Sequence, residues 1–290
     1  MGAGAGVAAI AGSGFVQRLL DGMPARLFAC TPSRLAAYTD CPRRYRMIYL
    51  DRPPPGKGPP WAHNSVGAAV HIALKRWWDL PLSRRTPEAA GALLDAAWLR
   101  DGFRDDRQCD KWRDAARDWL IRYFADLDPA DEPPGVERTV ATTTGRLAVS
   151  GRVDRIDRRG EELVVVDYKT GRWVPDADDA RGSQPLALYV LGVRRTFRAT
   201  CRRVELHHVP SRTTAVFEHT EESLARHVGR AEDTGADIVA ATAPVAAGGS
   251  TEDAFPPRTG SHCGWCDFRR HCPEGQRAAP AREPWAALRT

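Results

Sequence analysis

Two strand patterns joined by a short turn constrain the fold of this 290-residue chain more than any other feature. The first spans residues 150–157. The second spans 163–171 and begins with the apolar run Leu-Val-Val-Val. Such a run is typical of a strand that is buried on both faces. The sequence therefore predicts a hairpin at the centre of a sheet that other layers cover.

Acidic and basic side chains converge on one face of this hairpin. If residues 160–161 form a two-residue type II′ turn, the register sets Asp154 opposite Asp167, with Cβ atoms about 5 Å apart. Lys169 projects from the same face because strand side chains alternate. Two carboxylates this close repel each other unless a cation lies between them. The hairpin thus predicts a divalent metal site, with ordinary surface ion pairs as the simpler alternative.

The spacing of these residues resembles the core of the PD-(D/E)xK nucleases. A Gly-x-x-Asp motif ends at Asp154, and after twelve further residues Asp-x-Lys begins at Asp167. The resemblance implies an α/β, restriction-endonuclease-like core with a central mixed β-sheet flanked by helices. It also implies that Asp154, Asp167 and the backbone carbonyl of Tyr168 bind one or two Mg²⁺ or Mn²⁺ ions. Lys169 would orient the attacking water or stabilise charge on the phosphate.

A helix predicted over residues 64–78 carries another candidate metal ligand, His71. Together with Gly67 it forms Gly-x-x-x-His-x-x-Leu, which is similar to the segment before the core in the RecB-like branch of these nucleases. In that branch the histidine binds metal, whereas a single helical histidine is otherwise a packed or solvated residue. Two more helices are expected at 87–100 and 109–127. We expect their tryptophans to pack between helices rather than to stack on bases.

Three cysteines near the C-terminus form a metal-binding pattern, Cys-x₂-Cys-x₅-Cys-Pro, at Cys263, Cys266 and Cys272. Three thiolates require a fourth ligand. A zinc ion could recruit His262 or His271, whereas an iron–sulfur cubane prefers a fourth thiolate. The pattern alone leaves both metals open.

Cys41 is the candidate fourth thiolate. It lies in Ser-x-Leu-x-x-Tyr-x-x-Cys-Pro-Arg-Arg-Tyr over residues 33–45, which resembles the segment with the first cluster cysteine in RecB-like and Cas4-like nucleases. The resemblance implies a [4Fe-4S] cluster on Cys41 and the three C-terminal cysteines, which would join the N- and C-terminal segments. Thr31 and Pro32 predict the start of a helix that Pro42 interrupts. The remaining cysteines are expected to be inert: Cys30, Cys109 and Cys201.

Two candidate nucleic-acid-binding residues lie on a helix expected at 183–191. The family carries a Gln and a Tyr four residues apart on one helix face near the DNA. Gln184 and Tyr189 are five apart, about 140° around an ideal helix, and Tyr189 matches its position better. A later pair, His207 and His208, lies on an expected strand. Because neighbours on a strand point to opposite faces, we expect both histidines to be structural.

Composition and spacing indicate a leader, residues 1–25, followed by a single nuclease domain, 26–290. We expect an inserted helical region at 64–127, the nuclease core at 136–241 and the C-terminal cluster segment at 258–275. The net charge of +5 permits a polyanionic partner without requiring one. The sequence lacks a stretch apolar enough to span a bilayer and a Walker-type loop. Residues 2–12 also lack the basic n-region of a secretory signal, so a cytoplasmic protein is expected. In that reducing compartment the seven cysteines are expected to be ligands and spare thiols rather than a disulfide framework.

The predicted function is metal-dependent hydrolysis of DNA. We expect an exonuclease that acts on single-stranded DNA in DNA repair, recombination or CRISPR adaptation, with a helicase or a CRISPR adaptation protein as candidate partner. Two alternatives come from other classes of protein. One is a non-catalytic nucleic-acid-binding or assembly module that retains the nuclease fold, and the other is a zinc-binding protein.

Overall fold

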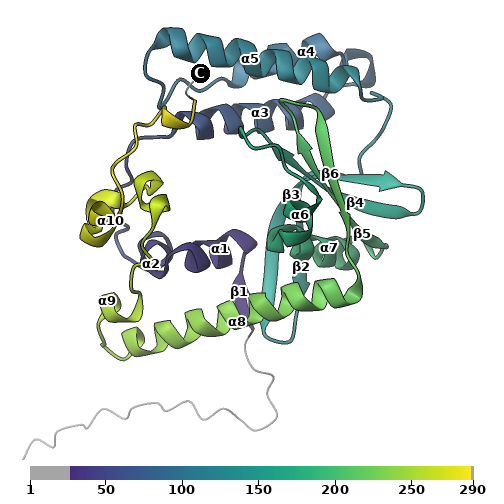
Figure 1. Ribbon diagram of the computed structural model, residues 1–290. Helices are drawn as coiled ribbons and strands as arrows, with labels where there is room; N and C mark the ends of the chain where they lie inside the picture. Colours follow the sequence, from purple (N-terminus) through teal and green to yellow (C-terminus); the bar gives the residue numbers. More distant parts are fainter. Residues whose placement is uncertain (1–26, 289–290) are drawn as a thin grey trace, which may run out of the picture.

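The computed structural model describes residues 27–288, which are built around one mixed sheet (Figure 1). Its strands are β1 (Phe28–Cys30), β2 (Gly135–Thr143), β3 (Leu147–Arg159), β4 (Glu162–Lys169), β5 (Cys201–His208) and β6 (Thr213–Glu218). The order is β1-β3-β4-β5-β6, and β2 also pairs with β3. β1 is parallel to β3 and β4 is parallel to β5, whereas the other pairs are antiparallel. The predicted leader, residues 1–25, lies outside the described residues.

The central hairpin has the predicted register. β3 and β4 pair from Arg159 with Glu162 down to Arg155 with Val166, which makes residues 154 and 167 the next positions in line. Gly160 has a φ of 61°, in the left-handed region that the first central position of a type II′ turn requires. The turn chemistry therefore fixes which carboxylates meet further along the ladder.

Both faces of β4 are buried, as its apolar run predicts. Val164 and Val166 pack into a core formed with three helices, α3 (Ala62–Trp78), α4 (Pro87–Ala97) and α5 (Asp106–Ala125). Leu163 and Val165 belong to a second core, against α7 (Gln184–Phe197). The α/β class with a mixed sheet flanked by helices is thus confirmed.

Local capping explains most helix boundaries. The Thr31 side chain accepts the Arg34 N–H at the start of α1 (Pro32–Asp40), as expected. Pro42 does more than interrupt this helix, because it is the first residue of α2 (Pro42–Tyr49) and leaves Cys41 between the two. The helix predicted from 109 begins three residues earlier because Asp105 caps it.

The remaining helical elements connect or flank these layers. They are η1 (Leu82–Arg84), α6 (Ala177–Gly182), α8 (Glu221–Ala246), α9 (Thr251–Ala254), η2 (Ser261–Trp265), η3 (Arg269–His271), α10 (Pro273–Ala278) and η4 (Ala286–Leu288). α8 continues through Pro244 to Ala246.

The helices and the sheet are arranged as the sides of a closed ring. Figure 1 shows α3, α4 and α5 stacked along one side, the sheet next to them, α8 along the opposite side, and α1, α2 and α10 closing the arrangement. The N- and C-terminal segments therefore lie together although they are far apart in sequence. A metal or cluster bound by both Cys41 and the C-terminal cysteines would require this proximity.

Between residues 27 and 288, the model contains no helix long and apolar enough to cross a membrane.

Candidate active site

The hairpin brings the two predicted carboxylates and the lysine to one end of the sheet. Asp154 on β3 accepts a hydrogen bond at 3.0 Å from the backbone N–H of Tyr168 on β4. Lys169 Nζ lies 2.6 Å from Asp167 Oδ2. Within the described chain this buried oxygen has no partner with hydrogen-bond geometry, so its contact with Lys169 is an ion pair only. The Lys169 ammonium therefore already neutralises this oxygen, and a divalent cation would have to share the carboxylate with it.

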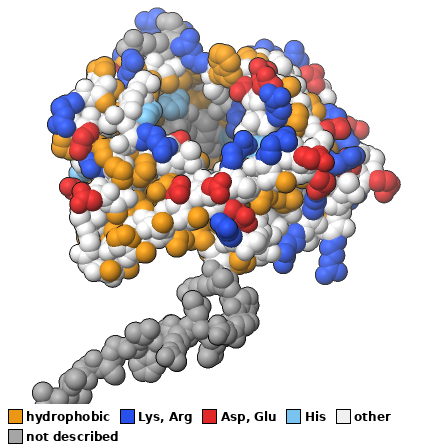
Figure 2. Space-filling view, turned by 60° about the horizontal axis from the view of Figure 1, so that its bottom comes forward, with side chains coloured by type: hydrophobic (Ala, Val, Ile, Leu, Met, Phe, Trp, Pro, Cys, Tyr) orange, Lys and Arg blue, Asp and Glu red, His pale blue; other side chains and the backbone are white. Residues whose placement is uncertain are grey.

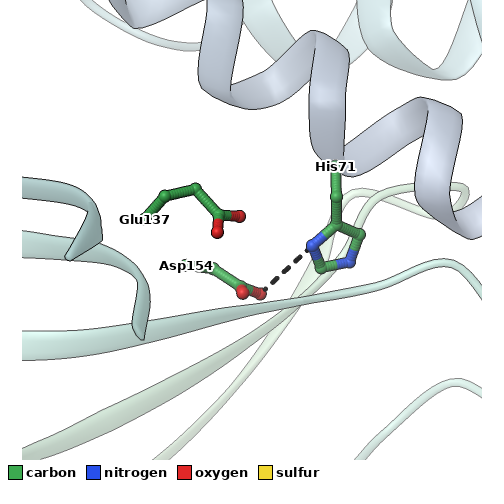
Figure 3. Close-up of side chains that lie close together, drawn as sticks. All are labelled: His71, Glu137 and Asp154. Atoms are coloured by element: carbon green, nitrogen blue, oxygen red, sulfur yellow. Dashed lines mark ion pairs between the residues drawn. The ribbon is translucent and has the colours of Figure 1, made fainter. Parts of the chain in front are cut away.

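His71 approaches this end of the hairpin from α3. Its Nδ1 lies 3.5 Å from Asp154 Oδ2 (Figure 3). One turn earlier Gly67 packs closely against the residue that follows β4, since a Cβ there would lie 3.3 Å from Thr170 Oγ1. The spacing from Gly67 to His71 thus has a physical reason: the glycine lets α3 come near enough for the histidine to reach the carboxylate.

Glu137 on β2 completes the group and was missed in the sequence. It lies directly opposite Asp154, because its neighbours Val136 and Arg138 pair with Arg155 and Val153. Ligand atoms of His71, Glu137 and Asp154 all lie within 4.8 Å of one another (Figure 3).

The backbone at Glu137 is unusual for a strand. Its φ is 48°, a left-handed value that costs a non-glycine residue about 1 kcal/mol or more. The side chain is held by Arg152, whose Nε lies 2.6 Å from Glu137 Oε2. The strained residue therefore turns a carboxylate toward Asp154 and is partly neutralised by a neighbouring, largely exposed arginine.

The electrostatics of the group favour a bound cation. Burial raises the pKa of Asp154 to about 6, and repulsion from Asp167 adds to this, while His71 acts in the opposite direction. A divalent ion would offset this repulsion, and carboxylate oxygens are its preferred ligands. Two carboxylates and one imidazole nitrogen within 4.8 Å fit Mn²⁺ or Mg²⁺ as a donor set.

We expect Asp154→Asn to stabilise the metal-free protein at pH 7 by roughly 1–3 kcal/mol. The folded state binds a proton at Asp154 more tightly than the unfolded chain does, so stability falls as pH rises from the unfolded pKa of 3.8 to about 6, and the full cost remains above that pH. Asn still accepts the Tyr168 N–H. Thermal unfolding in EDTA measures the gain; adding Mn²⁺ should stabilise the wild type more than the variant. A less stable variant in EDTA would contradict the prediction.

The side chain of Tyr168 points away from the carboxylates into the core under α3 and α5. Its hydroxyl accepts a hydrogen bond at 2.9 Å from Arg155, which also forms an ion pair at 2.8 Å with Asp157. Arg155 also donates to the hydroxyl of Tyr123 on α5, which contacts His207 Nδ1 at 2.8 Å. This buried network fixes β4 against the helical region, so it positions the backbone between Asp167 and Lys169.

The two histidines expected to be structural have protein partners. His207 Nε2 lies 2.9 Å from Glu205, and His208 Nε2 lies 2.7 Å from the Gly171 carbonyl oxygen.

Tyr189 and Gln184 have separate environments, as their shifted spacing suggested. Tyr189 lies near the carboxylates: burial raises its pKa to about 12, and Asp167 and Asp154 add to the effect. A Cβ at Gly151 would overlap the Tyr189 ring, which gives a reason for the glycine of Gly-x-x-Asp. Gln184 Nε2 instead donates to the His227 carbonyl of α8 at 3.4 Å.

All four cysteines of the proposed cluster line one cavity of about 470 Å³: Cys41, Cys263, Cys266 and Cys272. Gly275 leaves space beside two of the thiols, because a Cβ there would lie 3.3 Å from Cys272 Sγ and 3.6 Å from Cys263 Sγ. Backbone N–H groups of Gly275 and Arg258 point at Cys272 Sγ and Cys41 Sγ, at 3.3 and 3.4 Å. Such contacts suit thiolate ligands.

The other candidate ligands and thiols are arranged differently. His262 lines the cysteine cavity and contacts the Arg258 carbonyl at 2.9 Å, whereas His271 contacts the Gly56 carbonyl at 2.9 Å. Cys30, Cys109 and Cys201 are buried elsewhere. Burial raises the pKa of Cys30 to about 11 and that of Cys201 to about 12, which disfavours reactive thiolates at these two positions.

The mixed sheet carries two carboxylates and a lysine at the end of its central hairpin, with His71 of α3 beside them, which defines an α/β protein with a candidate metal site. A family model of the PD-(D/E)XK nuclease superfamily matches residues 29–273, and the chain belongs to this superfamily. None of the curated proteins compared matches it. Among solved structures, a candidate exonuclease from Eubacterium rectale is 13% identical, with a TM-score of 0.34 over 72% of this chain and 91% of that one.

Proposed function

We propose that this member of the nuclease superfamily hydrolyses DNA phosphodiesters with Mg²⁺ or Mn²⁺. The observation that carries the proposal is the convergence of His71, Glu137 and Asp154 within 4.8 Å beside the ion pair of Asp167 and Lys169. Ordinary surface ion pairs do not explain why three ligand-type side chains and a strained backbone meet at the end of a buried hairpin. The family match over residues 29–273 supports the same reaction.

Each residue has a distinct task in this mechanism. Asp154, Glu137 and His71 would hold the divalent ion, with Asp167 and the Tyr168 carbonyl as further ligands. Such an ion would polarise the phosphate and lower the pKa of a coordinated water. The Tyr168 N–H keeps Asp154 oriented. The Lys169 ammonium orients the attacking water or stabilises the charge that develops on the phosphate.

We propose further that Cys41, Cys263, Cys266 and Cys272 hold a [4Fe-4S] cluster. The cavity of about 470 Å³ is far larger than a single ion needs, since even a water molecule takes only about 30 Å³ of the liquid. The proposed role of the cluster is structural. It would join α1 and α2 to the C-terminal segment, and none of its four thiols belongs to the hydrolytic group. Zinc bound by the C-terminal cysteines and His262 is the alternative that metal analysis separates.

A single strand is the proposed substrate, and its end the proposed site of attack. Figure 2 shows a hollow in the molecular face with Lys and Arg side chains around it. Cationic groups at the rim of a hollow suit a phosphate backbone. We propose that such an activity serves DNA repair, recombination or CRISPR adaptation in the cytoplasm. The partner would be a helicase or a CRISPR adaptation protein.

The test uses purified protein with Mn²⁺ or EDTA on linear single-stranded, linear double-stranded and circular single-stranded DNA. A single-strand exonuclease degrades only the linear single strand and stops in EDTA. Cleavage of the circle would identify an endonuclease. Binding without cleavage of any substrate in Mn²⁺ or Mg²⁺ would contradict the enzyme and favour the non-catalytic module.

Glu137 gives a prediction specific to this chain. Glu137→Gln should weaken Mn²⁺ binding about 10-fold or more, because it removes one anionic ligand without changing the volume of the side chain. Arg152→Ala is the matched control: it frees Glu137 from its ion pair and should leave Mn²⁺ affinity unchanged or raise it. Calorimetric titration of Mn²⁺ into the wild type and each variant measures these affinities. Equal affinity in the wild type and Glu137→Gln would return Glu137 to a structural role.

A further inference from the structure

A large cavity of about 870 Å³ adjoins the candidate active site. One wall is the face of α3 that carries Gly67, Ala68 and His71, and the end of β4 contributes Lys169. The small side chains one turn before His71 leave the space open. The volume falls within the range of roughly 300–1,000 Å³ that holds small organic ligands, so a nucleotide fits.

Tryptophans from two distant parts of the chain form the aromatic wall of this cavity. Trp112 and Trp119 come from α5, seven residues apart and therefore on one helix face, with ring centroids 5.9 Å apart. Trp265 comes from η2 in the C-terminal segment. All three are only partly buried, so their rings remain available for contact.

We propose that this cavity, which we call the aromatic pocket, binds unpaired bases of a single DNA strand beside the catalytic residues. Trp112, Trp119 and Trp265 supply stacking surfaces. This inference rests on the proposed nuclease function and deepens it by naming how the substrate is held. A paired base in a duplex has both faces covered by its neighbours, so an aromatic pocket of this depth selects an unpaired strand.

The charges of the pocket fit this occupant. Lys169 and Arg172 line it, and none of the described residues that line it is acidic. The phosphates of a strand whose bases enter the pocket would therefore meet cations at the end of β4, next to the metal-binding group. Continuity with His71 and Lys169 places the stacked bases within a short distance of the scissile bond.

Trp265 connects the aromatic pocket to the cysteines. It lies between Cys263 and Cys266 in sequence, and it lines both the aromatic pocket and the cysteine cavity. Trp61 lies behind it, with ring centroids 5.2 Å apart, and the Arg282 guanidinium lies 5.9 Å from its centroid. The cysteine-bearing segment thus supplies one wall of the substrate pocket.

The experiment compares binding of a fluorescent 12-mer of thymidine with that of an abasic 12-mer of the same charge, with Ca²⁺ in place of Mn²⁺. Wild-type protein should prefer the thymidine strand. Trp119→Leu and Trp265→Leu should each weaken its binding roughly 5- to 100-fold and leave abasic binding unchanged, because stacking on an aromatic ring is lost. Trp119→Phe and Trp265→Phe should recover most of the preference for the thymidine strand over the abasic strand, whereas a packing role alone would change binding of both strands equally.

Trp98→Leu is the matched control, because Trp98 is partly buried in the helical region, donates to Cys109 Sγ and does not line the aromatic pocket. It should bind both strands like the wild type. Equal affinity of the wild type for the two strands would overturn base binding in the aromatic pocket, even if the protein cleaves DNA. The same holds if the Trp→Leu variants lose affinity for both strands equally. A base-dependent, Trp-dependent affinity in a protein that never cleaves upholds the pocket and rejects only the nuclease reaction.

Discussion

Replacing Lys169 with alanine is expected to slow cleavage of single-stranded DNA by about 10²- to 10³-fold, the usual cost of removing one preorganised charge from a transition state. The ammonium lies 2.6 Å from Asp167 and beside the proposed metal-binding residues, so it would be placed to act on the water or the phosphate. Mn²⁺ affinity should remain close to that of the wild type, because Lys169 donates no ligand. Single-turnover rates at saturating Mn²⁺, together with calorimetric titration, separate the two effects.

Asp154→Asn and Asp167→Asn should lose cleavage as well, but through the metal. Both variants should therefore show weaker Mn²⁺ binding, which Lys169→Ala does not. Lys75→Ala is the matched lysine control, since Lys75 is exposed on the same helix as His71. Rapid cleavage by Lys169→Ala with normal metal binding would remove Lys169 from the mechanism and leave the metal site intact.

The sequence was sufficient for this part of the site because local rules determine it. A glycine at the first position of a two-residue turn fixes the register of β3 and β4, and the register brings Asp154 and Asp167 together. An apolar run marks β4 as buried on both faces, which the packing of Val164 and Leu163 into different cores confirms.

Glu137 was missed because its placement depends on a different hairpin. β2 and β3 are joined through residues 144–146, which lack a diagnostic two-residue turn, so their register was not predicted. The left-handed φ of Glu137 also has no sequence signal, since glutamate rarely adopts it. The one available signal was the strand pattern that precedes β3: if β2 pairs with β3, its single glutamate, Glu137, is a candidate to lie opposite Asp154.

Helical periodicity indicates which tryptophans lie on the apolar face of a helix. It does not indicate which of them another element buries. Trp77 and Trp78 are buried in the core, and Trp112 and Trp119 pack against the same core, as expected for the helix at 109–127. Trp112 and Trp119 nevertheless also line an open pocket, because α3 presents Gly67 and Ala68 there. Whether an aromatic residue is covered depends on the partner element, which a single helix pattern does not encode. The three-residue strand β1 was likewise too short to show a period.

The cysteine ligands depend on contacts between the two ends of the chain, and their removal has the second large expected effect. Cys41 and Cys263 are separated by 221 residues, and the proposed shared cluster would close that loop. Closure of so long a loop is worth about 5 kcal/mol in chain entropy. Other contacts also join the segments. Tyr45 stacks on the buried ring of Phe255, with centroids 6.1 Å apart, and Arg43 forms an ion pair with Glu274 at 2.7 Å.

Cys41→Ser should therefore abolish the brown colour of protein purified without oxygen and lower the melting temperature by roughly 10–20 °C. Cys263→Ser, Cys266→Ser and Cys272→Ser should do the same, because each removes one ligand of a single cluster. Cys201→Ser is the control, as this thiol is buried in the core against α7 and should leave colour and iron content unchanged. Iron and sulfide analysis, visible absorbance and thermal unfolding measure these effects.

The same experiment separates iron–sulfur from zinc through Cys41 alone. A zinc site formed by the three C-terminal cysteines and His262 would give a colourless protein with one zinc per chain, and Cys41→Ser would then leave both metal content and melting temperature unchanged. His262→Ala would remove the zinc in that case, but it should not affect a cluster held by four thiolates. Because Trp265 lies between two of the cysteines, loss of the cluster should also weaken binding of the thymidine strand, whereas loss of an unrelated thiol should not.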